Sequence, residues 1–191
     1  MMRTVRTLAV ICTAGLIAAA CASVRSSPEI HYYVLAVTNG NAHSLPAPVR
    51  VDDFSIDGPY ATRQLAYRTS PYRLAYYNYH RWAGSPEGVV AAAVREFLEQ
   101  GTTEVEGVPF DISARVRRLE EVDDDDGWSG ALAIEFTVHR AGTLVLERAY
   151  SETEPAAERN PEQVVAALSR ALNTILHTLV GELADVHAST P

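Results

Sequence analysis

The sequence predicts a single α/β domain around a mixed, largely antiparallel sheet, which follows an N-terminal signal peptide. Two observations on pattern and one on length lead to this fold class. Segments with apolar, β-branched or aromatic residues at a period of two alternate with two segments of helical apolar spacing. Their order is strands, helix, strands, helix, without an obvious internal repeat. About 170 residues follow Cys21, enough for one domain of ordinary size.

The N-terminal segment has the layout of a bacterial lipoprotein signal. Arg3 and Arg6 precede an apolar run of 13 residues, and small residues lead directly to Cys21. A run of this length is too short to cross a bilayer, which takes about 20 helical residues. We therefore predict a signal peptide over residues 1–20, cleavage after Ala20, and attachment of acyl chains such as palmitate to Cys21.

One position departs from this signal pattern, because Ala18 stands where the best signals have leucine, three residues before the cysteine. A plain secretory signal that is cleaved near Ala20 or Ala22 is the alternative. In both cases Cys12 leaves with the signal, so the mature chain holds no second thiol for a disulfide.

The charge of the chain narrows the choice of partners. The whole sequence has a formal net charge of −8, and loss of Arg3 and Arg6 leaves 14 arginines against 24 acidic residues, a net charge of −10. Nucleic acid is therefore excluded as an expected ligand. Attachment to a membrane would come from the acyl chains on Cys21 rather than from a basic patch.

A tether over residues 21–29 is predicted between the lipid and the fold, because this stretch is rich in serine and contains Pro28. The folded domain is expected over residues 30–187, and a short tail over residues 188–191.

Four strands are predicted before the first helix, at residues 30–37, 49–56, 64–69 and 73–77. Turn residues separate the first two strands, and Ser70-Pro71 joins the last two into a hairpin.

Two helices are predicted from their caps and apolar faces. The first begins at Ser85-Pro86, has one apolar face and ends at Gly101. The second is the longest element, is capped by Asn160 and is expected to cover the sheet with its apolar face. Between the helices, residues 112–117, 132–138 and 143–150 alternate in polarity and predict an antiparallel meander.

The sequence patterns do not indicate an enzyme or a metal-binding protein. The sequence has no Gly-x-Ser-x-Gly motif, and the histidines are scattered singly, without metal-ligand spacing. We therefore predict no catalytic residue, no metal site and no cofactor. The histidines are His31, His43, His80, His139, His177 and His187.

The acidic run from Asp123 to Asp126 does not have the ligand spacing of a calcium-binding loop. Counting back from Gly127 places Val122 at the first ligand position, and Ala133 stands where the closing glutamate belongs. We therefore expect a solvated hairpin turn, at which weak cation binding stays open.

The most unusual stretch is residues 60–82, where tyrosines are interleaved with arginines and end at a tryptophan. One interpretation is that about half of these rings pack on the core. The other is a docking surface, because Tyr, Trp and Arg are the residue types that anchor interfaces. Strand alternation allows both at once. The candidate docking residues are Tyr67, Arg68, Tyr72, Tyr76, Tyr77 and Trp82.

These segments resemble the ABC-type transport auxiliary lipoprotein family from about Tyr33 to Val186. The resemblance is carried by Pro48-Val49-Arg50-Val51-Asp52-Asp53-Phe54, by Arg63-Gln64-Leu65-Ala66-Tyr67-Arg68, by Tyr76-Tyr77-Asn78-Tyr79-His80-Arg81-Trp82 and by Ser85-Pro86. The signal ending at Cys21 agrees with it, whereas the second half of the chain matches mainly in pattern.

The resemblance implies a three-layer α/β/α domain without enzymatic activity. It also implies a periplasmic lipoprotein that works with an ABC permease, an ATPase and a mammalian-cell-entry (MCE) domain protein that carries phospholipid between the inner and outer membranes. Ala22 after the cysteine, in place of aspartate, implies sorting to the outer membrane. Homo-oligomerisation stays open.

Two alternatives stay open beside this interpretation. The first is a stand-alone envelope lipoprotein with a binding or structural role in outer-membrane integrity. The second is a periplasmic hydrolase, which would need a Ser, a His and a carboxylate to converge in a pocket. The tyrosines of residues 60–82 would line an apolar groove if they bound lipid directly.

Overall fold

A computed structural model of the chain describes residues 28–38, 45–101 and 106–189. The predicted cleavage at Ala20, the predicted lipidation at Cys21 and most of the predicted tether lie outside these residues.

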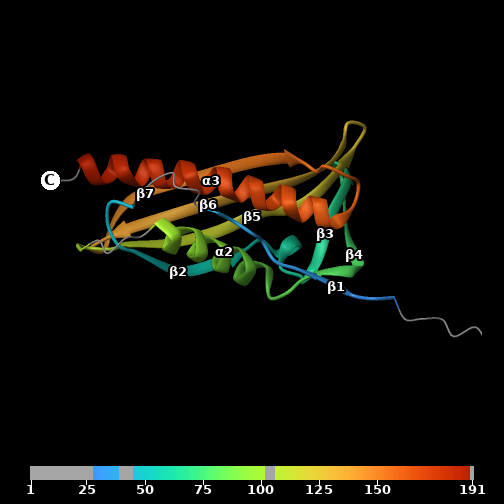
Figure 1. Ribbon diagram of the computed structural model, residues 1–191, viewed down its shortest axis with the longest axis horizontal. Helices are drawn as coiled ribbons and strands as arrows, with labels where there is room; N and C mark the ends of the chain where they lie inside the picture. The colour runs from blue at the N-terminus through green and yellow to red at the C-terminus, as the bar shows by residue number, and fades with distance from the viewer. Residues whose placement is uncertain (1–27, 39–44, 102–105, 190–191) are drawn as a thin grey trace, which may run out of the picture.

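The described residues form one α/β domain around a seven-stranded mixed sheet (Figure 1). The strand order is β1-β4-β3-β5-β6-β7, and β2 pairs with the other half of β5. The pairs β3–β4, β5–β6 and β6–β7 are antiparallel, and β1–β4, β2–β5 and β3–β5 are parallel. The strands are β1 (His31–Tyr33), β2 (Val49–Ile56), β3 (Gln64–Ser70), β4 (Arg73–Trp82), β5 (Phe110–Asp124), β6 (Gly127–Arg140) and β7 (Thr143–Pro155).

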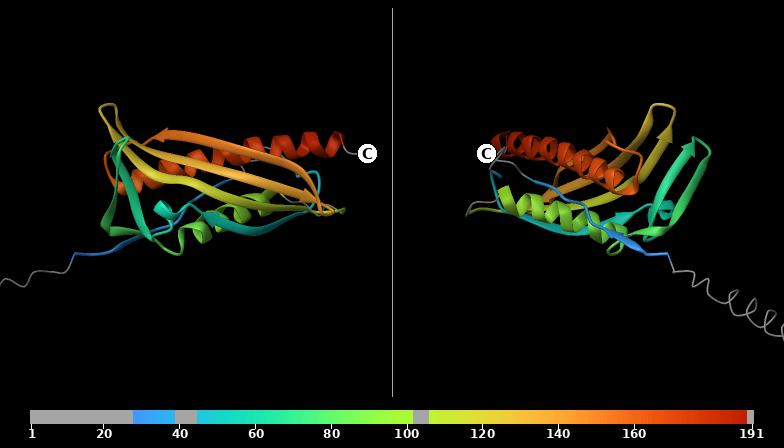
Figure 2. Two further views of the ribbon diagram at one scale, coloured as in Figure 1. Left: turned by 180° about the vertical axis from the view of Figure 1, so that it is seen from behind. Right: turned by 45° about the vertical axis from the view of Figure 1, so that its right-hand side comes forward.

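Both long helices cover the same face of the sheet, as the two views of Figure 2 show. They are α2 (Pro86–Gly101) and α3 (Pro161–Ser189), and a short 3-10 helix, η1 (Gly58–Tyr60), lies between β2 and β3. The Phe97 ring of α2 meets the His177 ring of α3, with the centroids 5.0 Å apart. The domain therefore has two layers and not the three that the family resemblance implied.

The alternation of β5 and β6 explains the two layers. Ile112 of β5 and its β6 partner Val138 are fully buried on the helix side. Arg115 and Glu135 form a register pair on the other face, which is polar here and is not covered by α2 or α3. A strand pattern of this kind buries only one face of a sheet.

Helix α3 lies unusually close to β6. A Cβ atom added to Gly130 of β6 would stand 2.7 Å from the backbone nitrogen of Leu168. The helix backbone therefore rests almost directly on the strand, and this close approach requires glycine.

Residues 34–38 do not continue the first strand, contrary to the expectation for residues 30–37. Figure 1 shows this segment passing between α2 and α3, and its residues Leu35 and Val37 are buried. The Ala36 N–H donates to Ser169 Oγ at 3.1 Å, and the Thr38 N–H donates to Asn173 Oδ1 at 3.1 Å. Side chains of α3 thus accept the hydrogen bonds that a neighbouring strand would accept. The segment has the composition of a strand, but its backbone N–H groups are bonded without a sheet partner.

The remaining elements are confirmed, and most strands extend beyond the predicted ends. Asn160 caps α3, since its Oδ1 accepts the Gln163 N–H at 2.9 Å. The acidic run ends in a turn between β5 and β6, where Asp124 Oδ1 accepts the N–H groups of Asp126 and Gly127.

Among the described helices, α3 alone is long and apolar enough, by length and composition, to cross a membrane. Its apolar residues face the sheet, and 61% of its most apolar window is buried inside the domain. This burial is typical of the core helix of a globular fold.

Candidate partner-docking surface

The predicted docking residues lie on or beside the hairpin of β3 and β4, which stands at one end of the sheet (Figure 2). The register places Ala66 opposite Tyr76 and Tyr67 opposite Ala75. On its other edge β3 pairs with β5, so that Ala66 lies beside Glu120 and Tyr67 beside Glu121. Opposite faces of this ribbon therefore carry different side chains.

Two of the predicted residues are exposed. Tyr72, in the turn between the strands, has 97% of its surface exposed, and Tyr76 has 37% exposed. The Tyr76 hydroxyl donates to the Pro59 carbonyl oxygen at 2.7 Å, which fixes the ring on the outer face, beside η1. These two rings form the tip surface, defined as Tyr72 and Tyr76.

Arg68 belongs instead to a buried ionic cluster on the same outer face. Its Nε donates to Glu120 Oε1 at 2.7 Å and its Nη2 to Oε2 at 3.0 Å, so the pair is bidentate. Arg118 Nε donates to Oε1 at 2.6 Å, and the Tyr60 hydroxyl donates to Oε2 at 2.9 Å. The Glu120 side chain is completely buried, and all its hydrogen bonds come from these three residues.

The cluster decides the ionisation of Glu120. Burial by itself would raise the pKa of this carboxyl, but hydrogen bonds from Arg68, Tyr60 and Arg118 together outweigh it and lower the pKa below its usual value. The hydrogen bond to Glu120 raises the pKa of Arg68 in turn. Glu120 is therefore an ionised, fully paired structural residue.

Tyr67 and Tyr77 lie on the inner face, beside a second buried carboxylate. Their ring centroids are 4.8 Å apart. The Tyr77 hydroxyl lies 3.0 and 2.9 Å from the two oxygens of Glu121. Glu121 is 2% exposed and forms no ion pair within the described residues.

Without a cationic partner, the electrostatics of Glu121 differ from those of Glu120. Burial raises the pKa of Glu121 to about 7, the Tyr77 hydrogen bond opposes the rise, and the charge of Asp123 adds to it. Burial, followed by the charge of Glu121, raises the pKa of the Tyr77 hydroxyl. This phenol therefore stays protonated.

A row of rings connects Tyr77 to the first strand. The centroid of the Tyr77 ring lies 5.2 Å from that of the His80 ring. The His80 ring stacks on the His31 ring, with the centroids 5.1 Å apart. His80 Nδ1 and the Tyr33 hydroxyl share a hydrogen bond of 2.8 Å. Burial, and then the nearby His31, lower the pKa of His80. The row ties the short strand β1 to the ribbon.

Trp82 does not reach the surface. It is 2% exposed and belongs to the hydrophobic core. Its backbone N–H donates to the Arg63 carbonyl oxygen at 2.7 Å and closes the base of the ribbon. Of the six predicted residues, the structure therefore exposes two at the tip and packs four into the ribbon or the core.

Glu120 and Glu121 were missed by the sequence analysis, which treated acidic residues only in the run that follows them. Their signal is two adjacent carboxylates inside a strand with strong alternation, since one of them must then face the apolar side. Among the described residues, no group of three or more His, Cys, Asp or Glu is arranged to hold a metal ion.

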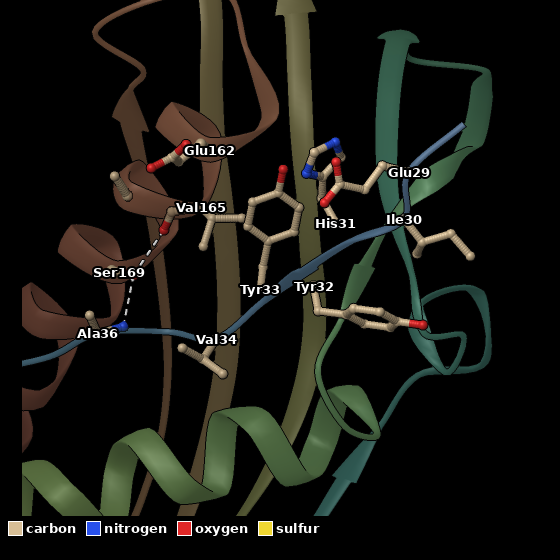
Figure 3. A pocket seen from close by; sticks show the side chains of 11 residues that line it. Glu29, Ile30, His31, Tyr32, Tyr33, Val34, Ala36, Glu162, Val165 and Ser169 are labelled. Atoms are coloured by element: carbon tan, nitrogen blue, oxygen red, sulfur yellow. Dashed lines mark hydrogen bonds between the residues drawn. The ribbon is translucent and has the colours of Figure 1, made fainter. Parts of the chain in front are cut away.

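A groove of about 570 Å³ lies between β1 and the first turns of α3 (Figure 3). In the close view the Tyr33 ring lies between Val165 of α3 and His31 of β1. Burial, and then the charge of Glu162, raise the pKa of the Tyr33 hydroxyl. The lining is mixed, since Ile30, Val34 and Val165 stand beside the polar groups of Glu29, Glu162 and Ser169, and the two carboxylates disfavour burial of an acyl chain there.

The chain matches one protein family over most of its length. Residues 33–180 match the model of the ABC-type transport auxiliary lipoprotein component, and the chain belongs to this family. The resemblance inferred from the sequence is thereby confirmed, and the family is one of envelope-associated lipoproteins that assist transport.

Two solved structures share the fold. A protein of Xanthomonas campestris, assigned to a family of unknown function, superposes with a TM-score of 0.68 at 17% identity, covering 82% of this chain and 96% of its own. A second, uncharacterised protein gives a TM-score of 0.66 at 14% identity, covering 82% and 99%. Likeness at this level shows the fold alone. No curated protein matches the chain in sequence.

Proposed function

We propose that this chain is a non-catalytic, lipid-anchored component of an ABC transport system of the MCE type, which moves phospholipid between the inner and outer membranes. Membership of the auxiliary lipoprotein family is the observation that carries the proposal. Acyl chains on Cys21 would hold the domain on the periplasmic face of the outer membrane. The permease and ATPase would supply transport direction and energy.

The tip surface is the part of the domain that we assign to docking on the MCE-domain partner. Tyr72 projects almost free of the domain, and Tyr76 adds a fixed ring on the outer face of the same ribbon. Exposed tyrosines cover a large area and lose little side-chain entropy on binding, which suits an anchor residue. Tyr67, Arg68, Tyr77 and Trp82 would then act by holding the ribbon in shape.

The test is a cross-linking pull-down from envelope membranes. We expect the intact lipoprotein to recover an MCE-domain protein and the folded double variant Tyr72→Ala with Tyr76→Ala to lose it. The matched control replaces Val108 and Leu144, which are 48% and 51% exposed elsewhere on the domain, by alanine. This control should recover the partner as the intact protein does.

The anchor is tested separately by the mass of the mature N-terminus. Acyl chains on Cys21 are expected, and Cys21→Ala should release the domain from membranes. Recovery of no transporter component by the acylated protein would favour the stand-alone envelope lipoprotein instead.

A further inference from the structure

A second exposed surface lies at the base of the ribbon, where the chain enters the sheet. Ile30, Tyr32 and Tyr79 have 37%, 57% and 45% of their surfaces exposed. Arg63 lies over the Tyr32 ring, with its guanidinium carbon 5.7 Å from the ring centroid. We call Ile30, Tyr32, Arg63, Tyr79 and Arg81 the base surface.

The strand register puts Tyr32 and Arg81 on one side of the ribbon, and Arg63 lies over the Tyr32 ring. His31 pairs with His80 and Tyr32 with Arg81, and the stacked histidine rings face the inner side. Strand neighbours point to opposite faces, so the register partners Tyr32 and Arg81 face outward. Tyr79 precedes them where the pairing of β4 with β3 is irregular, and its ring is exposed. Figure 3 shows the rings of Tyr32 and Tyr33 pointing in different directions, although both residues line the groove.

The arginines of the base surface are not neutralised within the fold. In the part of the chain that the structure describes, neither Arg63 nor Arg81 forms an ion pair. Arg63 donates to backbone oxygens of Trp82 and Ala83, and Arg81 only reaches the Asn78 oxygen at 3.5 Å while its Nε has no partner. Glu29, which precedes Ile30, is the acidic residue nearest in sequence to the five residues of the base surface. The base surface is thus locally basic on an acidic chain.

The base surface lies close in sequence to Cys21, the predicted site of the membrane anchor. Pro28, the first described residue, follows Cys21 after seven peptide bonds. A fully extended chain of that length spans at most about 25 Å. Ile30 and Tyr32 follow directly, so an acylated Cys21 keeps the base surface within a short reach of the bilayer.

We infer that the base surface rests on the phospholipid headgroups of the membrane in which Cys21 is anchored. Arg63 and Arg81 would bind phosphate oxygens, for which guanidinium has the matching geometry. Tyr32 and Tyr79 would place their rings at the level of the headgroups, where tyrosine is enriched in membrane proteins. This inference rests on the proposed lipid anchor and orients the domain on it.

A single-cysteine label tests the contact. The acylated mature chain has no free thiol, so Tyr79→Cys or Tyr32→Cys gives one site for an environment-sensitive fluorophore. Tyr72→Cys at the tip is the matched control. Each labelled full-length lipoprotein is reconstituted into vesicles of phosphatidylethanolamine and phosphatidylglycerol that contain a headgroup-bound nitroxide quencher.

We expect severalfold stronger quenching and a blue-shifted emission for labels at residues 79 and 32 than for the label at residue 72. Changing both Arg63 and Arg81 to Gln should reduce that difference. Circular dichroism of each variant shows that it remains folded. Equal quenching at base and tip in an acylated protein would overturn this inference and leave the proposed function standing.

Two further outcomes would also count against the inference. A label at residue 79 that is shielded only after envelope proteins are added would assign the base surface to a protein partner. A mature N-terminus without acyl chains would overturn the anchor and the headgroup contact together, and mass spectrometry distinguishes this case from the others.

Discussion

Glu120 and Glu121 are adjacent in β5 and both buried, but they differ in how the protein deals with their charge. Glu120 faces outward into a bidentate pair with Arg68, whereas Glu121 faces inward against a tyrosine hydroxyl. Burial penalises an ionised carboxyl, and only the first has cations nearby to offset this penalty. We therefore expect different effects of mutation at the two sites. At Glu120 the loss of a cation should lower stability, and at Glu121 removal of the carboxyl should change how stability depends on pH.

Removal of the cation from the first site should be costly. Arg68→Met leaves the buried Glu120 carboxylate with Arg118 and Tyr60 alone, and we expect the free energy of unfolding to fall by about 3 kcal/mol. The control is Arg73→Met, on the exposed part of the same ribbon, which should change it by no more than about 0.5 kcal/mol. Urea unfolding measures both, and equal losses would contradict the assigned role of the cluster.

The second site should make stability depend on pH. Since the folded pKa of Glu121 is about 7 against an ordinary 4.5, its protonated form is favoured in the folded state, and this contribution is lost as pH rises through about 7. The advantage of the parent over Glu121→Gln should therefore shrink by about 3 kcal/mol between pH 4.5 and pH 8.

The difference between the two proteins is the quantity to measure, because His80 acts in the opposite direction. Its lowered pKa costs stability as pH falls, but it does so equally in parent and variant. Urea unfolding at four pH values gives the difference, and a flat profile would show that Glu121 does not titrate as described.

At the scale of elements, the contact between α3 and β6 sets the thickness of the domain. Gly130 lies below Leu168 and Val164, and a methyl group there would meet helix backbone rather than a movable side chain. A second glycine, Gly181, lies within α3 and has open space around its Cβ position. The two glycines therefore allow a matched comparison.

Gly130→Ala should lower the free energy of unfolding by about 3 kcal/mol, because the helix must move away from the strand. Gly181→Ala should raise it by about 0.5 to 1 kcal/mol, since alanine is the better helix former. Thermal and urea denaturation test both signs. Destabilisation of similar size in both variants would indicate that backbone proximity is not the cause.

Local patterns predicted most elements because they follow from local chemistry. Ser85-Pro86 and Asn160-Pro161 start the helices, and alternation in 112–117 finds the centre of β5. The segment 34–38 could not be predicted, since only the two helices far along the chain satisfy its backbone. Similarly, Trp82 and Arg68 have the composition of interface residues, and it is tertiary packing on Glu120 and the core that buries them.

At the scale of the whole molecule, one hydrophobic core extends under both helices and along most of the sheet. Net charge describes this molecule poorly, because the chain is acidic while the base surface is basic. The expectation that no basic patch assists membrane attachment treated the charge as evenly spread; it stays a prediction, and the vesicle experiment decides between it and our headgroup proposal.

A shared core predicts cooperative unfolding. Trp82 lies in the ribbon and Trp128 at the start of β6, so each reports on a different part of the sheet. In Trp128→Phe and Trp82→Phe, the fluorescence midpoint in urea should coincide with the circular dichroism midpoint of the same variant. Separate midpoints in the variant that retains Trp82 would show that the ribbon unfolds independently.

The brevity of β1 has a mechanical consequence. Any tension that a membrane anchor puts on the domain arrives first at three residue pairs with β4 and next at Leu35 and Val37, which the helices grip. The long antiparallel strands β5, β6 and β7 carry none of this load until both have given way. Under such tension β1 and the segment that follows it should therefore detach before the sheet unfolds. Because β4 stays in place, a detached β1 can pair with it again.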